Sequence, residues 1–221
     1  RGSKKLNKAP MSKKYIKEAC VESLAQAIKA EEKGADRLEL CAYLAFDGLT
    51  PAPDLISEVI KAVKIPVRVM IRPRNGDFNY SEEELEHMKA CIAFCKKEGA
   101  EGVVFGVLNE SKKLNIEAIE MLTKAAKPLK VVIHKAIDAT PDIDAALKEL
   151  LQVEGVDTVL TSGGKSNAFD GAENLNRLIT MAGNKLQIMP AGKITQFNLT
   201  ELHHLVEAEA YHGRLIVGEL A

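Results

Sequence analysis

The strongest constraint on the fold is a regular alternation of short β-prone runs with longer helical patterns, which starts at Tyr15 and continues to the end of the chain. Each unit takes about 25–30 residues, the length of one strand and one helix with their loops. Eight runs are predicted as strands: Ile16–Cys20, Arg37–Cys41, Val67–Arg72, Gly102–Leu108, Lys130–Ile137, Thr158–Ser162, Leu186–Pro190 and Ala210–Ile216. Seven helical patterns separate them: Ser23–Lys33, Asp54–Val63, Glu82–Gly99, Ile116–Lys127, Ile143–Val153, Asn174–Ala182 and Asn198–Glu207.

Eight strands with seven intervening helices predict an α/β fold of the (β/α)8 or TIM-barrel type, with the last helix short or absent. A doubly wound sheet is the alternative, but it seldom keeps so regular a spacing over eight units. The sequence stops at Ala221, soon after the eighth run. We therefore expect a gap in the outer ring of helices and a second subunit that covers it, which makes the protein a homo-oligomer.

The composition, 46% hydrophobic and 28% charged, is that of an ordinary globular domain. Residues 1–14 hold six basic residues and no acidic one. We interpret this segment as an artificial leader and residues 15–221 as a single domain. Without the leader the chain has an excess of acidic residues, which argues against nucleic acid as a partner. No apolar run is long enough for a membrane-spanning helix, and the four cysteines predict a reducing, cytoplasmic setting rather than a disulfide scaffold.

The first two predicted strands end in the same pattern, Glu18-Ala19-Cys20 and Glu39-Leu40-Cys41. Because side chains alternate between the two faces of a strand, each glutamate shares the interior of the barrel with its own cysteine. The two strands are neighbours, so we expect the two thiols to meet at the C-terminal mouth, with the carboxylates a layer beneath. Such a thiol pair suits Cu(I) first and Zn(II) second. Two buried apolar cysteines and a transient disulfide are the alternatives.

Cys91 and Cys95 lie four residues apart on the predicted third helix, beside a stripe of apolar residues that faces the sheet. Core packing is the better interpretation for these two thiols.

The third predicted strand turns Arg68, Met70 and Arg72 into the barrel. The two arginines are expected to neutralise Glu18 and Glu39, because buried charges require partners. Either a structural ion-pair network or a substrate-binding role fits this arrangement equally well.

The loop after this strand, Arg72-Pro73-Arg74-Asn75-Gly76-Asp77, lies at the end of the barrel where such folds place their chemistry. The planar guanidinium of Arg74 suits a carboxylate or a phosphate, and Asp77 is a candidate to orient neighbouring groups.

The later strands end in further candidates. His134, Lys135 and Asp138 close the fifth strand and suit acid–base catalysis or an anion clamp. We expect His134 to face the same interior as Glu39 and Arg72. Small residues and glycines after the last strands expose backbone N–H groups that can cradle a phosphate. The candidates for this cradle are Ser162, Gly163, Gly192 and His212.

The chain resembles the CutC copper homeostasis family. The resemblance rests on Glu-Ala-Cys-Val-Glu-Ser, Gly-Ala-Asp-Arg-Leu-Glu-Leu-Cys, Met-Ile-Arg-Pro-Arg-Asn-Gly-Asp-Phe-Asn-Tyr-Ser, His-Lys-Ala-Ile-Asp and Leu-Thr-Ser-Gly, in that order from about Tyr15 onward. It implies a TIM barrel, a cytoplasmic location, an oligomer, and Cu(I) binding at Cys20 and Cys41. Where the family often has His-Arg, this chain has His134-Lys135, which loses the bidentate geometry of arginine.

Two functions follow. In the first, Cys20 and Cys41 hold Cu(I), with Glu18 and Glu39 as outer carboxylates. In the second, the protein is a TIM-barrel enzyme of unassigned reaction on a small anionic substrate, a phosphate or a carboxylate. Its anion would be held by Arg72, Arg74 and Lys135, and its protons moved by Glu18, Glu39 or His134, with Asp77 or Asp138 orienting them.

Overall fold

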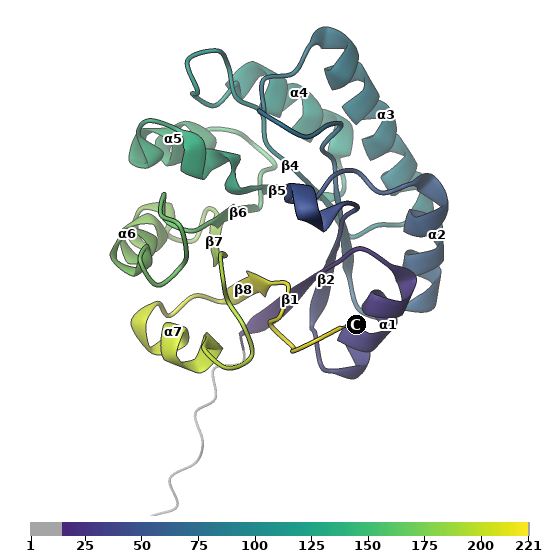
Figure 1. The fold of residues 1–221 in the computed structure, drawn as a ribbon. Helices are drawn as coiled ribbons and strands as arrows, with labels where there is room; N and C mark the ends of the chain where they lie inside the picture. Colours follow the sequence, from purple (N-terminus) through teal and green to yellow (C-terminus); the bar gives the residue numbers. More distant parts are fainter. Residues whose placement is uncertain (1–14, 221) are drawn as a thin grey trace, which may run out of the picture.

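The computed structural model describes residues 15–220, and the predicted leader lies outside the described residues. All eight strands are parallel and are hydrogen-bonded in the order β7-β6-β5-β4-β3-β2-β1-β8 (Figure 1). This nearly closed barrel confirms the TIM-barrel prediction. The strands are β1 (Ile16–Val21), β2 (Arg37–Leu40), β3 (Val67–Met70), β4 (Gly102–Phe105), β5 (Lys130–Ile133), β6 (Thr158–Thr161), β7 (Gln187–Pro190) and β8 (Ala210–Gly213).

The α-helices form an outer ring that runs from α1 to α7 (Figure 1). They are α1 (Leu24–Glu32), α2 (Pro53–Ala62), α3 (Glu82–Glu98), α4 (Ile116–Ala126), α5 (Ile143–Leu150), α6 (Ala172–Ala182) and α7 (Leu199–Leu205). Between β8 and residue 220 no further helix forms, as the sequence predicts. The loops after β7 and β8 meet instead in a parallel bridge between Thr195 and Leu215.

Local sequence signals fix the helix ends. The Ser81 hydroxyl accepts from the Glu84 N–H and the Glu84 carboxylate accepts from the Ser81 N–H, so the predicted capping box at the start of α3 is confirmed. Gly99 ends the same helix at a φ of 86°, a left-handed conformation that glycine adopts at little cost. Helix α3 therefore begins and ends where the sequence indicates.

Most strands are shorter than predicted, and three of them end at least three residues early. β4 ends at Phe105 rather than Leu108, β8 at Gly213 rather than Ile216, and β5 at Ile133 rather than Ile137. After β5 the chain turns into a short 3₁₀ helix, η2 (Lys135–Ala139), because the His134 ring accepts the Ala136 N–H. The apolar residues Ala136 and Ile137 are buried in this helix rather than in a strand, so their β-like pattern was misleading.

The apolar interior has two layers. The larger lies between the sheet and the helices. The smaller fills the barrel with Met70, Val104, Val132, Leu160 and Met189, and Cys20 and Cys41 belong to it. Packed apolar side chains thus close the barrel beneath its C-terminal mouth, where a second 3₁₀ helix, η1 (Leu44–Phe46), also lies.

Candidate functional site

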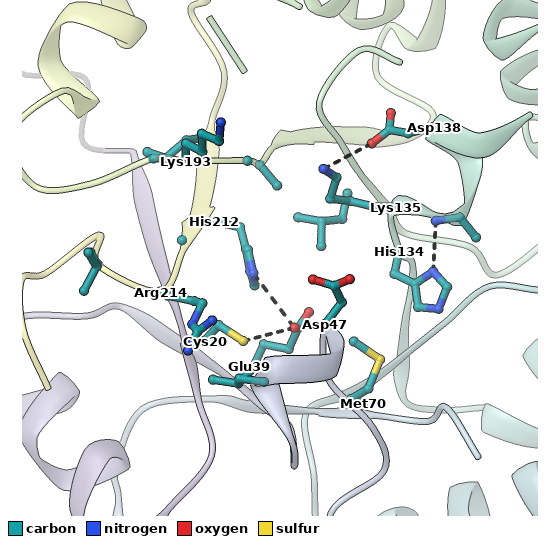
Figure 2. Close-up of a pocket in the computed structure, with 18 of the residues that line it drawn as sticks. Cys20, Glu39, Asp47, Met70, His134, Lys135, Asp138, Lys193, His212 and Arg214 are labelled. Carbon is teal, nitrogen blue, oxygen red and sulfur yellow. Dashed lines mark hydrogen bonds and ion pairs between the residues drawn. The ribbon is translucent and has the colours of Figure 1, made fainter. Parts of the chain in front are cut away.

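A cavity of about 830 Å³ opens at the C-terminal ends of the strands (Figure 2). Its walls combine apolar side chains, such as Met70, Phe78 and Leu160, with ionisable ones. The ionisable residues that line it are Cys20, Glu39, Asp47, Arg72, His134, Lys135, Asp138, Lys193, His212, Arg214 and Glu219. The sequence therefore predicts correctly that the chemistry gathers at this end of the barrel and that His134 shares one interior with Glu39 and Arg72.

The two thiols meet as predicted. The Sγ atoms of Cys20 and Cys41 are 3.7 Å apart, and both cysteines are free and buried. Their positions follow from the register, in which Cys20 lies opposite Glu39 on the neighbouring strand. Both thiols also contact one carboxylate oxygen, Glu39 Oε1, at 3.6 Å from Cys20 and 3.3 Å from Cys41. Glu39 is therefore level with the sulfurs, and the prediction that it lies a layer beneath them is wrong.

His212 adds a nitrogen donor to this group. One ligand atom each from Cys20, Glu39 and His212 lie within 4.8 Å of one another, and all three residues are buried. The sequence interpretation assigned His212 to anion binding and did not include it among the candidate metal ligands. The signal was available, because β8 pairs with β1 and brings His212 opposite Glu18.

Glu18 is the centre of a buried ion-pair network. It pairs with Arg37 from β2, lies 3.8 Å from the Arg68 guanidinium, and accepts a hydrogen bond from His212 Nδ1 at 2.9 Å. Arg68 is shared with Glu101 at 2.6 Å. The expected neutralisation by Arg68 is therefore present, but the second cation is Arg37, which the sequence interpretation overlooked.

Arg72 does not neutralise Glu18 or Glu39, contrary to the expectation. Its guanidinium donates to the carbonyls of Phe46, Gly48 and Gly76 at 2.8, 3.2 and 3.0 Å, and lies 4.9 Å from the centre of the Phe78 ring. The reason is geometric: Arg72 follows the end of β3, above the layer of the carboxylates. Arg72 thus ties together two loops at the mouth of the barrel.

The buried charges shift the pKa values of the two glutamates in opposite directions. Burial alone raises the pKa of Glu18, but the His212 hydrogen bond and the charges of Arg37 and Arg68 lower it to about 2. Burial raises the pKa of Glu39 to about 8, against the attraction of His212. At neutral pH Glu18 is therefore ionised and Glu39 holds a proton.

The two thiols differ in the same way. The hydrogen bond from Cys41 lowers the pKa of Cys20, burial raises it, and the contact with His212 lowers it again. The result is a pKa of about 5. The same thiol–thiolate contact and burial raise the pKa of Cys41 well above its usual value. Burial opposes a charge on His212, but Glu39, Cys20 and Glu18 raise its pKa well above its usual value. Cys20 is thus a thiolate at neutral pH, the form that attacks electrophiles and binds metal ions.

Arg74 and Asp77 lie outside the residues that line the cavity. Arg74 pairs with Glu84 at 2.5 Å and with Asp77 at 3.0 Å, and its guanidinium lies 5.2 Å from the Tyr80 ring. In this structure the guanidinium of Arg74 holds the loop to the start of α3.

The predicted phosphate cradle after β6 is filled by the protein itself. The carboxylate of Asp138 accepts from the N–H groups of Ser162 and Gly164, both at 2.9 Å, and from the hydroxyl of Ser162 at 2.9 Å. Gly163 donates its N–H to the Thr161 hydroxyl. Asp138 therefore occupies the place of an anion there, with Lys135 3.7 Å away. Gly192, the remaining candidate, lines the cavity together with His212.

His134 is a neutral, buried histidine. Its Nδ1 accepts the Ala136 N–H, so its hydrogen is on Nε2. Burial and the nearby charge of Arg72 lower its pKa to about 3. A role as proton acceptor at neutral pH is therefore opposed by its surroundings.

The titration of His134 predicts a pH-dependent stability. An unfolded histidine has a pKa of about 6.5, so between about pH 6.5 and pH 3 the unfolded chain binds a proton that folded His134 refuses. Its contribution to stability is complete above pH 6.5 and is lost as the pH falls, by up to ~1.4 kcal/mol per pH unit. Urea unfolding of wild type and His134→Gln from pH 7 to pH 4.5 measures it. The variant should show the shallower pH dependence, and equal slopes would contradict the assignment.

The interpretation of Cys91 and Cys95 as packing residues is confirmed. Cys95 is buried in the layer between sheet and helices, and Cys91 packs against that layer from its edge. Burial raises the pKa of Cys95 to about 12, so this thiol is unreactive.

Comparisons with known proteins place this geometry in a family. The model of the CutC family matches residues 15–216. The chain belongs to the CutC family. It is 42% identical over 205 residues to the human copper homeostasis protein cutC homolog, covering 93% of this chain and 75% of that protein. A CutC family protein of Xylella fastidiosa (strain Temecula1) is 37% identical over 196 residues, covering 89% and 73%.

Solved structures agree with the fold. The crystal structure of CutC from Streptococcus agalactiae superposes with a TM-score of 0.87 at 29% identity and covers 92% of this chain and all of that one. A deoxyribose-phosphate aldolase structure from Coccidioides immitis reaches a TM-score of 0.64 at 12% identity, covering 90% and 81%. At that identity the likeness shows the shared TIM barrel alone, whereas the first superposition supports the CutC assignment.

Proposed function

We propose that this CutC protein binds Cu(I) through Cys20 and Cys41 at the barrel mouth. The observation that carries the proposal is the 3.7 Å separation of the two sulfurs, which is short enough for one ion to bridge at metal–sulfur bonds of ~2.3 Å. Thiolate ligands are soft and favour Cu(I). The name of the human relative, which refers to copper homeostasis, also supports copper as the metal.

The surroundings of the sulfurs fit a cation of low charge. Cys20 is already ionised, and Glu39 and His212 can complete the ligand set if each releases its proton, since a metal ligand must be deprotonated. Loss of these protons makes binding stronger as the pH rises. Buried apolar side chains, Met70 and Leu44 among them, surround the group and limit access of water.

The cellular location of the protein belongs to the same proposal. A pair of free thiols this close stays reduced in the cytoplasm, and we place the protein there. Among the described residues no helix is long and apolar enough to cross a membrane.

A Cu(I) titration tests the proposed function. Reduced protein, kept free of oxygen, is titrated with Cu(I) in competition with a chromophoric Cu(I) chelator. We expect about one Cu(I) per chain, with Zn(II) bound more weakly because the two soft sulfur ligands favour Cu(I). Failure to compete with the chelator would contradict the proposal.

A homo-oligomer is the proposed assembly, because apolar side chains are exposed on the loops that flank β8. Phe197 is 88% exposed and Leu215 39%. Sedimentation velocity should give a mass that is a multiple of the 24.1 kDa chain, and Phe197→Ser should shift it toward the monomer. A wild-type protein that sediments as a monomer would contradict this expectation.

An enzyme acting on a small anionic substrate is the second candidate. The observation that favours it is the cavity, whose volume of about 830 Å³ is far beyond the need of one ion and within the range of small-molecule sites. Glu39, which keeps its proton at neutral pH, is the residue best placed to donate one to a molecule bound there.

A further inference from the structure

We infer that the loops after β7 and β8 form a binding site for the anionic group of a small organic molecule, a phosphate ester or a carboxylate, with Lys193 and Arg214 as its cations. This inference deepens the second candidate function and does not depend on Cu(I). Lys193 and Arg214 both line the cavity, and both are exposed to it from the side of β7 and β8 (Figure 2).

The two cations have no partner of opposite charge. Among residues 15–220, every other arginine is engaged by a carboxylate or by backbone carbonyls, whereas Arg214 makes no hydrogen bond or ion pair. Lys193 likewise has no acceptor for its side chain in that part of the chain. Two unpaired cations beside one concave wall attract an anion, and low-dielectric walls strengthen that attraction.

The backbone of the β7 loop offers further donors. Neither the Gly192 N–H nor the Lys193 N–H has an acceptor within residues 15–220. Both residues have left-handed backbones, with φ of 102° and 58°. Such a conformation is strained for a non-glycine residue such as Lys193, and strained positions of this kind cluster at ligand sites.

The neighbouring β6 loop shows what such a loop does when an anion is present. There the carboxylate of Asp138 takes two backbone N–H groups, those of Ser162 and Gly164. In the β7 loop the comparable N–H groups have no carboxylate from the described chain. Of the loops that the sequence prediction of an anion cradle names, the β7 loop with Gly192 is therefore the one whose N–H groups are left for a ligand.

Close packing brings the two loops together. A Cβ atom at Gly213 would lie 2.4 Å from the Ile194 carbonyl oxygen, so only glycine lets the end of β8 approach the β7 loop this closely. Arg214 follows directly after Gly213 in the sequence. The two cations therefore come from loops that are held against each other, which gives the site a fixed frame.

The rest of the cavity fixes the class of the ligand. Apolar side chains, including Phe78, Leu160 and Ile194, line it beside the ionisable ones. An inorganic ion alone leaves this volume unfilled. The ligand is therefore a small organic molecule whose anionic end lies at Lys193 and Arg214 and whose body lies along these apolar side chains.

Isothermal titration calorimetry with matched three-carbon probes tests the inference. Glycerol 3-phosphate represents the phosphate esters, glycerate the carboxylates and glycerol the neutral body, all at one ionic strength. We expect at least one of the two anions to bind and glycerol not to bind. Binding of one anion alone identifies that class. If neither anion binds at millimolar concentration, the inference is wrong.

Variants locate the anion. The double variant Lys193→Gln/Arg214→Gln should weaken binding by about tenfold or more, whereas Lys61→Gln, an exposed lysine on α2 outside the cavity, should leave it unchanged. If Lys61→Gln weakens anion binding as much as the double variant does, the effect comes from the overall charge of the protein. That result would contradict the proposed site.

The cysteine variant Cys20→Ser/Cys41→Ser separates this inference from Cu(I) binding. It should keep its affinity for the anion while losing Cu(I). Loss of the anion as well would place its charge at the thiols and contradict the assignment to Lys193 and Arg214.

Discussion

Replacement of both Cys20 and Cys41 by serine is expected to weaken Cu(I) binding by more than ~100-fold, which is more than the loss of an outer-shell partner costs. Serine keeps the size of the side chain but replaces a soft thiolate with a hard hydroxyl that does not ionise at neutral pH. Because the two sulfurs lie 3.7 Å apart and share one ion in the proposal, each single variant should lose most of the affinity. Chelator competition with reduced protein measures the effect.

The control is Cys91→Ser, which removes a half-buried thiol on α3 that does not line the cavity. It should bind Cu(I) like the wild type. His212→Gln, which removes the nitrogen donor of the group, should fall between the two. If the double variant retains wild-type affinity while its circular dichroism is unchanged, the thiol pair is not the Cu(I) site.

The part of the site that the sequence predicts is the part set by strand alternation. Glu18, Cys20, Glu39 and Cys41 follow one another on two adjacent strands, so their faces are fixed by the period of two and their neighbourhood by the barrel. No information about distant loops is required. For the same reason the repeat of strands and helices, which is local, predicts the barrel.

The partners of these groups depend on register and loop height, which alternation does not give. Arg37 is two residues before Glu39 and faces the interior by the same rule, yet only the pairing of β1 with β2 shows that it lies opposite Glu18. Arg72 follows the same alternation as Arg68, but it comes after the end of β3 and its guanidinium reaches loop carbonyls instead.

The sequence also leaves the conformation of the loops open. The pattern of glycines after β6 predicts an anion cradle, and the cradle is there, but Asp138 of the η2 helix fills it. That contact joins two residues 24 positions apart through the pairing of β5 with β6. A β-like run of residues, Lys130–Ile137, conceals the turn that brings Asp138 to this position.

Replacement of Glu18 by glutamine should destabilise the fold by about 3–5 kcal/mol, the loss seen when one partner of a buried ion pair is removed. The side chain of Glu18 has no exposed surface, and it is the shared anion of Arg37, Arg68 and His212. A neutral amide of the same size leaves these cations buried without full compensation. Urea unfolding at pH 7 measures the change, and the matched control Glu154→Gln, whose side chain is 91% exposed in its pair with Lys127, should change stability by less than about 1 kcal/mol.

A second pair of variants separates loss of the charge from loss of packing. Arg37→Met alone removes a cation and should also destabilise, but Glu18→Gln/Arg37→Met removes an anion and a cation together. Since each single change leaves the other charge without its partner, the double variant should be more stable than the sum of the two single effects predicts, by at least about 1 kcal/mol. Strict additivity would mean that Glu18 and Arg37 contribute by packing alone. In that case the orientation of His212 would not depend on the ion pair between Glu18 and Arg37. The group formed by Cys20, Glu39 and His212 would then be independent of that ion pair as well.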